Sequence, residues 1–316
     1  MLILFVVIGG FLLYHVGYSI NDTVNKTKKE LKLSAKRSKK VNIQKDPFTV
    51  LLIGTDGRSP YTHNWRPDVL MIAAINPKNH SMKIVSIPRD TYVEIANTNG
   101  AKDKINAAAA YAYQKKINPV QNIRETVENL FHIPIDYYAK VNFQGFTDIV
   151  NVLGGVDVNV PFSFHSKTIG GKTAYFEKGP AHLNGSEALA YVRMRRNDPE
   201  GDKGRNKRQR EVVQQLVDKL TSLNVVTKFP ELVETVSNNF EYSFSLSEIA
   251  SLSHSYHQSK DNIEEIEIQT TPSRKYLGGV YAYIELIPEK EQERISKILQ
   301  QQIEYEPSTK ANIYPL

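Results

Sequence analysis

Two apolar runs joined by a short polar turn constrain the fold of this chain more than any other feature. Residues 68–77 read DVLMIAAINP, and residues 82–95 read MKIVSIPRDTYVEI. The segment NPKNH at 76–80 is polar and short, which suits the connection of a β-hairpin. A third apolar run, FTVLLIGTD at 48–56, ends in Gly and Asp and predicts a buried strand with functional groups at its carboxyl end. These runs predict the centre of a sheet.

Segments with helical and extended patterns alternate along the rest of the chain. The segment 118–131 has Asn118 as N-cap and Pro119 at the first helical position. Further helices are expected at 106–116, 144–155, 184–195, 207–220, 228–239, 246–258 and 288–303, and further strands at 136–143, 156–161, 263–270 and 279–286. No linker rich in Gly, Pro or Ser interrupts residues 46–305. The sequence therefore predicts a single α/β domain with a mixed, partly antiparallel central sheet flanked by helices.

The net charge of +6 belongs to a short segment and not to the predicted domain. Residues 21–45 hold nine of the 40 Lys and Arg but only two of the 34 acidic residues, so 31 basic and 32 acidic residues remain elsewhere. A domain that follows a nucleic-acid backbone is usually basic overall. We therefore expect no nucleic-acid partner. Residues 21–45 predict a basic tether attracted to anionic membrane lipid.

The first 20 residues, MLILFVVIGGFLLYHVGYSI, contain no Lys, Arg, Asp or Glu. A helix of this length spans about 30 Å, the thickness of a bilayer core. A cleaved signal peptide and a buried helix are the alternatives, but no small-residue cleavage site follows the run. The sequence thus predicts one N-terminal transmembrane signal-anchor (1–20), a tether (21–45), the domain (46–305) and a tail (306–316).

The orientation of this anchor is not decided by charge. The excess of positive charge after residue 20 would place that side in the cytoplasm. Either a cytoplasmic basic leader precedes residue 1, or the tether is translocated despite its charge.

Two carboxylates flank the first connection between predicted strands. Asp56 ends the first apolar run, and Asp68 begins the second. If the two strands are neighbours, both side chains project from one edge of the sheet. Two carboxylates together with substrate oxygens suit Mg²⁺. The alternative is ordinary turn chemistry, since Asp-Gly is a common turn pair.

Basic residues form a second group of candidates. The stretch RMRRNDPEGDKGRNKRQR at 193–210 has eight Lys or Arg in eighteen positions. Guanidinium groups match phosphate oxygens bidentately, so converging arginines can hold a pyrophosphate. The candidates are Arg89, Lys104, Arg193, Arg195, Arg205, Arg208 and Gln209. For any one arginine, a salt bridge to Asp198, Glu200 or Asp202 is an equal alternative.

Other site motifs are absent from the sequence. The segment GGKT at 170–173 lacks the glycine spacing of a phosphate-binding P-loop. His254 and His257 have no third ligand in register for a metal, and the chain contains no cysteine.

Several of these segments occur together in the order of one known family. LLIGTDGR, RPDVLMIAAINP, IVSIPRDTYVEI, DKINAAAAYA, VNFQGFTDIVNVLGGVDVNVP, LNGSEALAYVRMRR and GDKGRNKRQREV resemble the LytR-CpsA-Psr family of cell-wall enzymes. They are most similar to its teichoic-acid ligases from Gram-positive bacteria. The resemblance is strong over about 48–220 and looser elsewhere.

The resemblance implies a membrane-anchored protein with an extracellular catalytic domain. Such an enzyme transfers a glycopolymer from a polyprenyl-pyrophosphate carrier to the C6 hydroxyl of peptidoglycan muramic acid, as a phosphodiester. Asp56 and Asp68 would hold Mg²⁺. The residues implied to bind the pyrophosphate are Arg89, Lys104, Arg193, Arg195, Asp202, Arg205 and Gln209, of which Arg89, Arg193 and Arg195 would also be catalytic. The general base and the polymer stay open.

The sequence leaves two further points open. The apolar faces of the helices at 106–113, 121–131 and 144–153 fit either a protein core or a groove for the lipid. Two other functions compete with the ligase: a membrane-bound DNA-binding regulator and a non-catalytic carrier of lipid-linked glycan.

Overall fold

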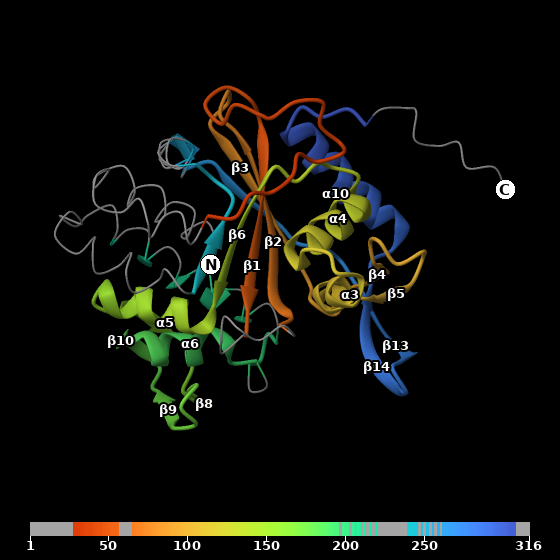
Figure 1. Cartoon of the computed structure of the whole chain (residues 1–316). Helices are drawn as coiled ribbons and strands as arrows, with labels where there is room; N and C mark the ends of the chain where they lie inside the picture. Colours follow the sequence, from red (N-terminus) through yellow and green to blue (C-terminus); the bar gives the residue numbers. More distant parts are fainter. Residues whose placement is uncertain are drawn as a thin grey trace. The chain divides into compact units, whose positions relative to one another are not determined.

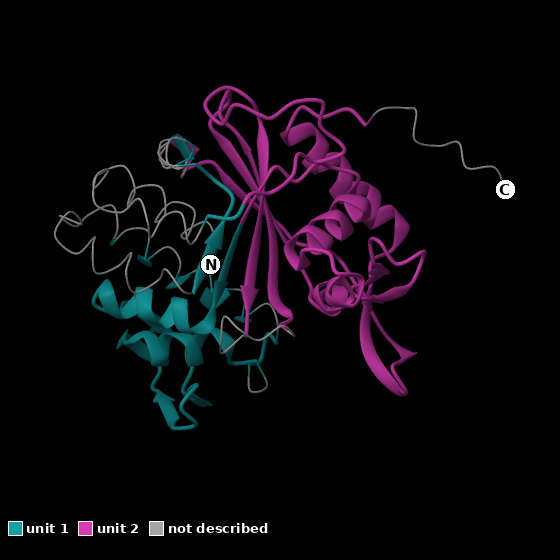
Figure 2. Ribbon diagram, in the orientation of Figure 1, with its two compact units in different colours: residues 1–29, 57–60, 139–253 teal, residues 30–56, 61–138, 254–316 magenta. Residues whose placement is uncertain are grey.

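The computed structural model divides into two compact units (Figure 2). Unit 1 comprises residues 1–29, 57–60 and 139–253, and unit 2 comprises 30–56, 61–138 and 254–316. The structure describes residues 28–56, 65–195, 198–201, 204–205, 207–209, 211–212, 215–216, 219, 239–245, 248, 251–252, 255, 258–259 and 261–307. The predicted anchor at 1–20 lies outside these ranges. Within them, no helix has the length and apolar character needed to cross a bilayer.

The largest sheet has the strand order β11-β6-β1-β2-β3-β12 (Figure 1). Its members are β1 (Phe48–Thr55), β2 (Pro67–Asn76), β3 (Ser81–Ile87), β6 (Tyr137–Asn142), β11 (Phe240–Tyr242) and β12 (Ile263–Ile266). The pairs β1–β2, β2–β3 and β6–β11 are antiparallel, whereas β12 runs parallel to β3. The prediction of a mixed, partly antiparallel sheet is confirmed.

The hairpin predicted at residues 76–80 is present between β2 and β3. Residues 77–80 form the turn, and Asn76 pairs with Ser81 across it. The side-chain oxygen of Asn76 accepts from the Lys78 backbone N–H at 3.0 Å, which closes the turn from within. The polar residues in this segment therefore make the connection that the sequence predicts.

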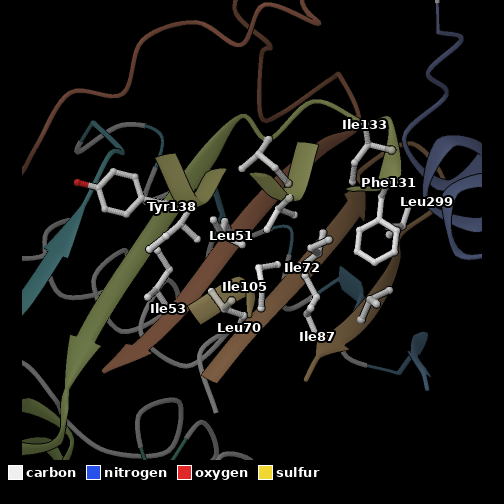
Figure 3. Packing of buried hydrophobic residues seen from close by; sticks show 14 of the residues in the cluster. Leu51, Ile53, Leu70, Ile72, Ile87, Ile105, Phe131, Ile133, Tyr138 and Leu299 are labelled. Atoms are coloured by element: carbon white, nitrogen blue, oxygen red, sulfur yellow. The ribbon is translucent and has the colours of Figure 1, made fainter. Parts of the chain in front are cut away.

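Unit 2 has one continuous apolar core (Figure 3). Every residue of β1 is buried, so this strand is covered on both faces. The core is completed by three helices, α3 (Ala108–Lys115), α4 (Pro119–Phe131) and α10 (Glu289–Gln302). Asn118 caps α4 by accepting from two backbone N–H groups, and Pro119 occupies the first position, as predicted.

The apolar faces of α3 and α4 belong to this core. Ala108, Ile123 and Phe131 are completely buried, and Figure 3 shows Phe131 beside Leu299 of α10. Of the two interpretations that the sequence left open for these faces, core packing is the one that the structure supports in unit 2. Burial of each such side chain stabilises the fold by roughly 1.5–3 kcal/mol.

Residues 30–45, predicted as part of the basic tether, pack within unit 2. The Arg37 guanidinium donates to both carboxylate oxygens of Asp136, at 2.9 and 2.8 Å. The Ile43 side chain is buried. Some of the positive charge assigned to the tether is thus matched by a carboxylate of the fold.

The described residues of unit 1 include two complete helices, further helical backbone between 204 and 219, and two small antiparallel sheets. The helices are α5 (Phe143–Val152) and α6 (Gly185–Arg193); β7 (Val156–Val160) pairs with β10 (Gly179–Leu183), and β8 (Phe164–Lys167) pairs with β9 (Thr173–Phe176). The helix α6 begins with a capping box between Asn184 and Glu187. A Cβ on Gly185 would lie 2.1 Å from the Thr147 carbonyl oxygen, so glycine lets α6 approach α5 closely.

Unit 2 also contains two separate two-stranded sheets. β4 (Tyr92–Glu94) pairs with β5 (Lys102–Lys104), and β13 (Thr271–Leu277) pairs with β14 (Val280–Leu286). A 3₁₀ turn, η1 (Ile105–Ala107), leads from β5 into α3. The sequence predicted β14 but not β13.

Candidate active site

Asp56 and Asp68 lie at the same edge of the sheet in unit 2. Asp56 follows the last residue of β1 and is exposed, and Asp68 is the second residue of β2. Because β1 and β2 are antiparallel neighbours, the end of one lies beside the start of the other. The condition on which the sequence-based interpretation of the two acids rested is therefore met.

A β-bulge sets the position of Asp68. Gly54 pairs with Val69, but the next residue, Thr55, pairs with Pro67. Asp68 is thus an extra residue on β2 with no partner on β1. Bulges redirect a side chain out of the regular alternation of a strand and are common beside functional sites.

Arg89 faces Asp68 because of the register of β2 and β3. Leu70 pairs with Ile87, and the two strands are antiparallel. Two residues further along, Arg89 after β3 therefore comes opposite Asp68 of β2. The Arg89 Nη1 donates to Asp68 Oδ1 in an ion pair. Burial works to lower the pKa of Arg89, but the hydrogen bond and negative charge of Asp68, together with Asp90, outweigh it and raise that pKa.

The charges continue through Asp90 to Lys104. Arg89 Nε lies 3.6 Å from Asp90 Oδ2, and Lys104 Nζ donates to Asp90 Oδ1 at 2.7 Å. Lys104 ends β5, so the strand that carries it and the end of β3 contribute to one cluster. Asp68, Arg89, Asp90 and Lys104 therefore form an alternating series of opposite charges. Asp90 was not among the residues selected from the sequence.

Backbone hydrogen bonds hold the turn that carries Arg89. Thr91 donates from its N–H to the Pro88 carbonyl at 3.0 Å and from its hydroxyl to the same oxygen at 2.6 Å. The Asn106 N–H donates to the Arg89 carbonyl at 3.3 Å. These bonds fix the direction in which the Arg89 side chain leaves the backbone.

Asn106 is a candidate that sequence reasoning missed. Its side chain is buried, and its Oδ1 accepts no hydrogen bond among the described residues. An unsatisfied buried oxygen is uncommon and often marks a ligand or water position. In the sequence, an Asn at the start of a helical run indicates only a helix cap, so residue type and position did not single it out.

The two acids fit a magnesium ion that is completed by a substrate. Mg²⁺ is commonly held by one or two carboxylates together with phosphate oxygens and water. Arg89 engages Oδ1 of Asp68, which leaves Oδ2 for another partner, and Asp56 is exposed. The described residues contain no cluster of three or more His, Asp or Glu that could hold a metal alone. Asp56 and Asp68 could therefore supply only part of a Mg²⁺ coordination shell, with water or other oxygens as the remaining ligands.

In unit 1, Arg193 and Arg195 lie at the carboxyl end of α6. Both are exposed, and Met194 between them has left the helix for an extended conformation. The Arg193 guanidinium lies over the Phe143 ring, 4.4 Å from its centroid, so a cation–π contact holds it at the surface. Both cations thus lie at the surface of unit 1.

Arg208 has a different role from its neighbours in the basic stretch. Its side chain is 2% exposed and forms an ion pair with the Asp198 carboxylate, whose side chain is 1% exposed. It also donates to the Tyr191 and Met194 carbonyls, and its guanidinium carbon lies 5.7 Å from the centroids of both the Phe164 and the Tyr191 ring. For this arginine, the salt-bridge alternative is the correct one.

The other candidate residues of unit 1 differ in how far they are buried. Gln209 is buried and donates to the Val192 carbonyl at 3.4 Å, so it supports α6. Arg205 is partly exposed, and both residues lie in helical backbone four positions apart, as predicted. Asp202 lies outside the described residues. The structure thus groups Asp56, Asp68, Arg89 and Lys104 in unit 2, and Arg193, Arg195, Arg205 and Gln209 near the Arg208–Asp198 pair in unit 1.

Comparison with known proteins identifies similar sequences and structures. The family model LytR_cpsA_psr matches residues 14–301. The polyisoprenyl-teichoic acid–peptidoglycan teichoic acid transferase TagV of Bacillus subtilis is 38% identical over 312 residues, which cover 98% of this chain and 78% of TagV. The crystal structure of B. subtilis TagV has a TM-score of 0.67 and 39% identity, with 83% of this chain and 99% of that chain covered.

A second similar structure is that of TagT bound to LIIa-WTA. Its TM-score is 0.67 at 31% identity, with 87% of this chain and 99% of that chain covered. The family match spans most of the residues, and the similarity to TagV extends over nearly all of them. The chain therefore belongs to the LytR-CpsA-Psr family.

Proposed function

We propose that this protein is a transferase that moves an anionic glycopolymer, such as wall teichoic acid, from a polyprenyl-pyrophosphate carrier to the C6 hydroxyl of peptidoglycan muramic acid. The observation that carries the proposal is the end of the sheet in unit 2 where Asp68 pairs with Arg89, Asp90 pairs with Lys104, and Asp56 follows the neighbouring strand β1. Such an edge offers both a metal-binding pair of carboxylates and cations for phosphate oxygens. Further support comes from relatives that are named teichoic acid transferases and align over most of the chain.

The transfer balances as a phosphoryl substitution. The acceptor hydroxyl oxygen bonds to the sugar-proximal phosphorus, the bond from that phosphorus to the bridging oxygen breaks, and polyprenyl phosphate leaves. The hydroxyl proton passes to a base that the residues do not identify. Arg89 and Lys104 neutralise charge on the phosphate oxygens and orient the pyrophosphate, which is the main contribution of a protein to this chemistry. Mg²⁺ held by Asp56 and Asp68 would supply further neutralisation of the same charge.

The basic residues of unit 1 have a complementary part in the proposal. Arg193 and Arg195 are exposed cations with the bidentate geometry that suits phosphate. We assign them, together with Arg205, Gln209 and Asp202, to binding of the pyrophosphate. Arg208 is left out of this group because its guanidinium is committed to Asp198 and two backbone carbonyls.

The proposed setting is the outer face of a cell membrane. Residues 1–20 carry no formal charge and have the length of a bilayer-spanning helix, which supports a single-pass anchor. Polyprenyl-linked glycan, membrane lipid and peptidoglycan would then be the partners, and the catalytic units would be extracellular.

The first experiment measures turnover with the full chain in detergent. Truncation at residue 46 is avoided because it would remove Arg37, which binds Asp136. The assay combines a polyprenyl-pyrophosphoryl saccharide, peptidoglycan oligomers and Mg²⁺, and it follows both polyprenyl phosphate release and glycan attachment. Asp68→Asn should lower turnover by roughly 100-fold or more because it removes a proposed Mg²⁺ ligand, and Arg195→Ala should do the same because it removes a cation that would stabilise the negative charge developing on the phosphate oxygens.

Matched controls distinguish site chemistry from general damage. Asp261→Asn changes an exposed acid of unit 2, and Arg294→Ala changes a surface arginine of α10 that pairs with Glu291. Both variants should retain parental turnover, while chelation of Mg²⁺ should stop it. A parent chain that binds the lipid-linked saccharide tightly but never releases polyprenyl phosphate would contradict the enzyme and favour a carrier.

A further inference from the structure

The hairpin of β13 and β14 carries most of the exposed large apolar surface. Six large apolar side chains are exposed in the described part of the chain, and four of them lie on this hairpin: Tyr276 (65%), Val280 (63%), Tyr281 (74%) and Tyr283 (39%). Figure 1 shows the hairpin extending away from α3 and α4. Such a concentration on one element marks an interaction surface, because exposed apolar residues are normally scattered.

The strand register separates the hairpin into two faces. Tyr276 pairs with Tyr281, and Arg274 pairs with Tyr283, so these four side chains share one face. The opposite face includes Ile284, which is fully buried. The Tyr276 and Tyr281 rings contact each other edge to face, with centroids 5.3 Å apart. The outward face is therefore an ordered aromatic surface with a cation beside it.

The side chains also change in a regular order away from the tip. The turn is Gly278-Gly279, both with positive φ, and Leu277 and Val280 flank it without any charge. The tyrosine pair comes next, followed by Lys275 and then Arg274, both of which are exposed. The first acidic residue from the tip is Glu285, which lies nearer the base.

This order matches the layers of a membrane interface. At about 3.3 Å per residue, the apolar, aromatic and cationic levels fall within about 10 Å. Peripheral elements insert their apolar surface about 5–10 Å into the boundary between headgroups and acyl chains. Tyrosine favours that boundary because its ring is apolar and its hydroxyl is polar, and lysine and arginine are attracted to anionic headgroups.

We propose that the β13–β14 hairpin inserts its tip into the interface of an anionic lipid bilayer. Leu277 and Val280 enter the acyl boundary, the tyrosines lie at the headgroup level, and Arg274 and Lys275 contact lipid phosphates. A contact of this size is reversible and adds to a second membrane attachment, for which residues 1–20 are the candidate. The proposal does not depend on the transferase function. A glycan that stacks on the tyrosines is the competing occupant, but it gives no reason for an uncharged, exposed Val280 at the tip.

The absence of cysteine from the chain makes a direct test possible. The full chain with Val280→Cys is labelled with an environment-sensitive fluorophore and reconstituted into vesicles of phosphatidylcholine with phosphatidylglycerol. The control is Asn79→Cys, an exposed position in the β2–β3 turn of the same unit. The label at 280 should shift to the blue and be quenched by lipid-borne quenchers, whereas the label at 79 should show neither change.

A variant with fewer positive charges, and a measurement with peptidoglycan fragments in place of vesicles, complete the experiment. Arg274→Gln and Lys275→Gln are introduced together into the labelled Val280→Cys protein. The equilibrium constant between the lipid-contacting and the lipid-free hairpin should fall by roughly 30-fold, since each cation near an anionic surface contributes about fivefold. Melting temperatures of the labelled variants check that all are folded. Identical emission and quenching at 280 and 79 in vesicles would overturn the proposal. So would a blue shift at 280 that requires peptidoglycan fragments and occurs without vesicles.

Discussion

The Arg208 guanidinium lies inside the basic stretch but does not face solvent. Its Nε donates to the Tyr191 carbonyl at 3.0 Å, and its two Nη atoms bind the Met194 carbonyl and the Asp198 carboxylate. These acceptors surround the point where α6 ends and where Arg193 and Arg195 leave the helix. A Cβ on Gly204 would lie 2.0 Å from the Asp198 carboxylate, so glycine gives this acid its space. Arg208 is therefore a positioning residue for the exposed arginines.

Removing either partner of this buried pair should destabilise the protein strongly. Arg208→Met or Asp198→Asn leaves a buried charge without its counter-ion, a change that costs about 3–5 kcal/mol. Urea denaturation of the full chain measures the loss in the free energy of unfolding. Lys207→Gln is the matched control, because Lys207 forms an exposed pair with Glu200 that contributes roughly 0–1 kcal/mol. Equal stability of the Arg208 and Lys207 variants would contradict this role.

At the level of elements, the segment 30–45 and helix α4 share a buried network. Arg124 of α4 is 3% exposed and donates to the Lys32 carbonyl at 2.5 Å. Glu128, one turn later, accepts from the Ile135 N–H at 2.8 Å. Burial raises the pKa of Glu128 and outweighs the lowering effects of Ser34, Ile135 and Arg124. The segment that the sequence assigned to a tether thus closes over a buried carboxyl group.

The raised pKa of Glu128 gives a pH dependence with a definite sign. The folded protein keeps this proton at pH values where the unfolded chain, with its ordinary value of 4.5, has released it. Stability relative to Glu128→Gln, which cannot ionise, should therefore fall as pH rises from about 4.5 through the raised pKa. Urea denaturation of both proteins across this range provides the test. Glu293→Gln, which changes an exposed acid on α10 of the same unit, is the control. A free energy of unfolding of the parent, minus that of Glu128→Gln, that stays constant or increases with pH would contradict the assignment.

At the level of the whole molecule, the residues proposed to bind pyrophosphate are distributed over both units. Asp68 belongs to unit 2 and Arg195 to unit 1. If both act on one pyrophosphate, their losses should not multiply, because residues that act as a unit are strongly non-additive. We expect the double variant Asp68→Asn/Arg195→Ala to be only slightly slower than the worse single variant. Steady-state rates of all four proteins measure the coupling, and fully multiplicative losses would indicate independent sites.

Much of the central fold was predictable from local patterns. The β2–β3 hairpin followed from two apolar runs and a polar turn, and α4 followed from Asn118 and Pro119 at its start. Both predictions depend on interactions between residues that are close in sequence. β13 was missed because its burial does not alternate regularly and its outward face is exposed, so it lacks the period-two pattern of a half-buried strand.

The candidate site was only partly accessible from the sequence. Asp68 and Arg89 were selected by type and position, but their ion pair depends on a strand register that links residues 21 positions apart. Arg208 and Arg195 have the same side chain and lie in the same basic stretch. Burial separates them, because one is enclosed by Asp198 and two carbonyls while the other is exposed.

Local sequence alone specified the apolar strands, the helix starts, the basic stretch and the family to which its motifs belong. Those features are encoded by the identity and spacing of neighbouring residues. Tertiary contacts determined which charged side chains are paired and placed the apolar helix faces of unit 2 in its core. They also determined that residues 30–45 pack within unit 2 and that one hairpin exposes three tyrosines. The physical reason is that burial and register arise from contacts between distant segments, and local sequence patterns do not specify these contacts.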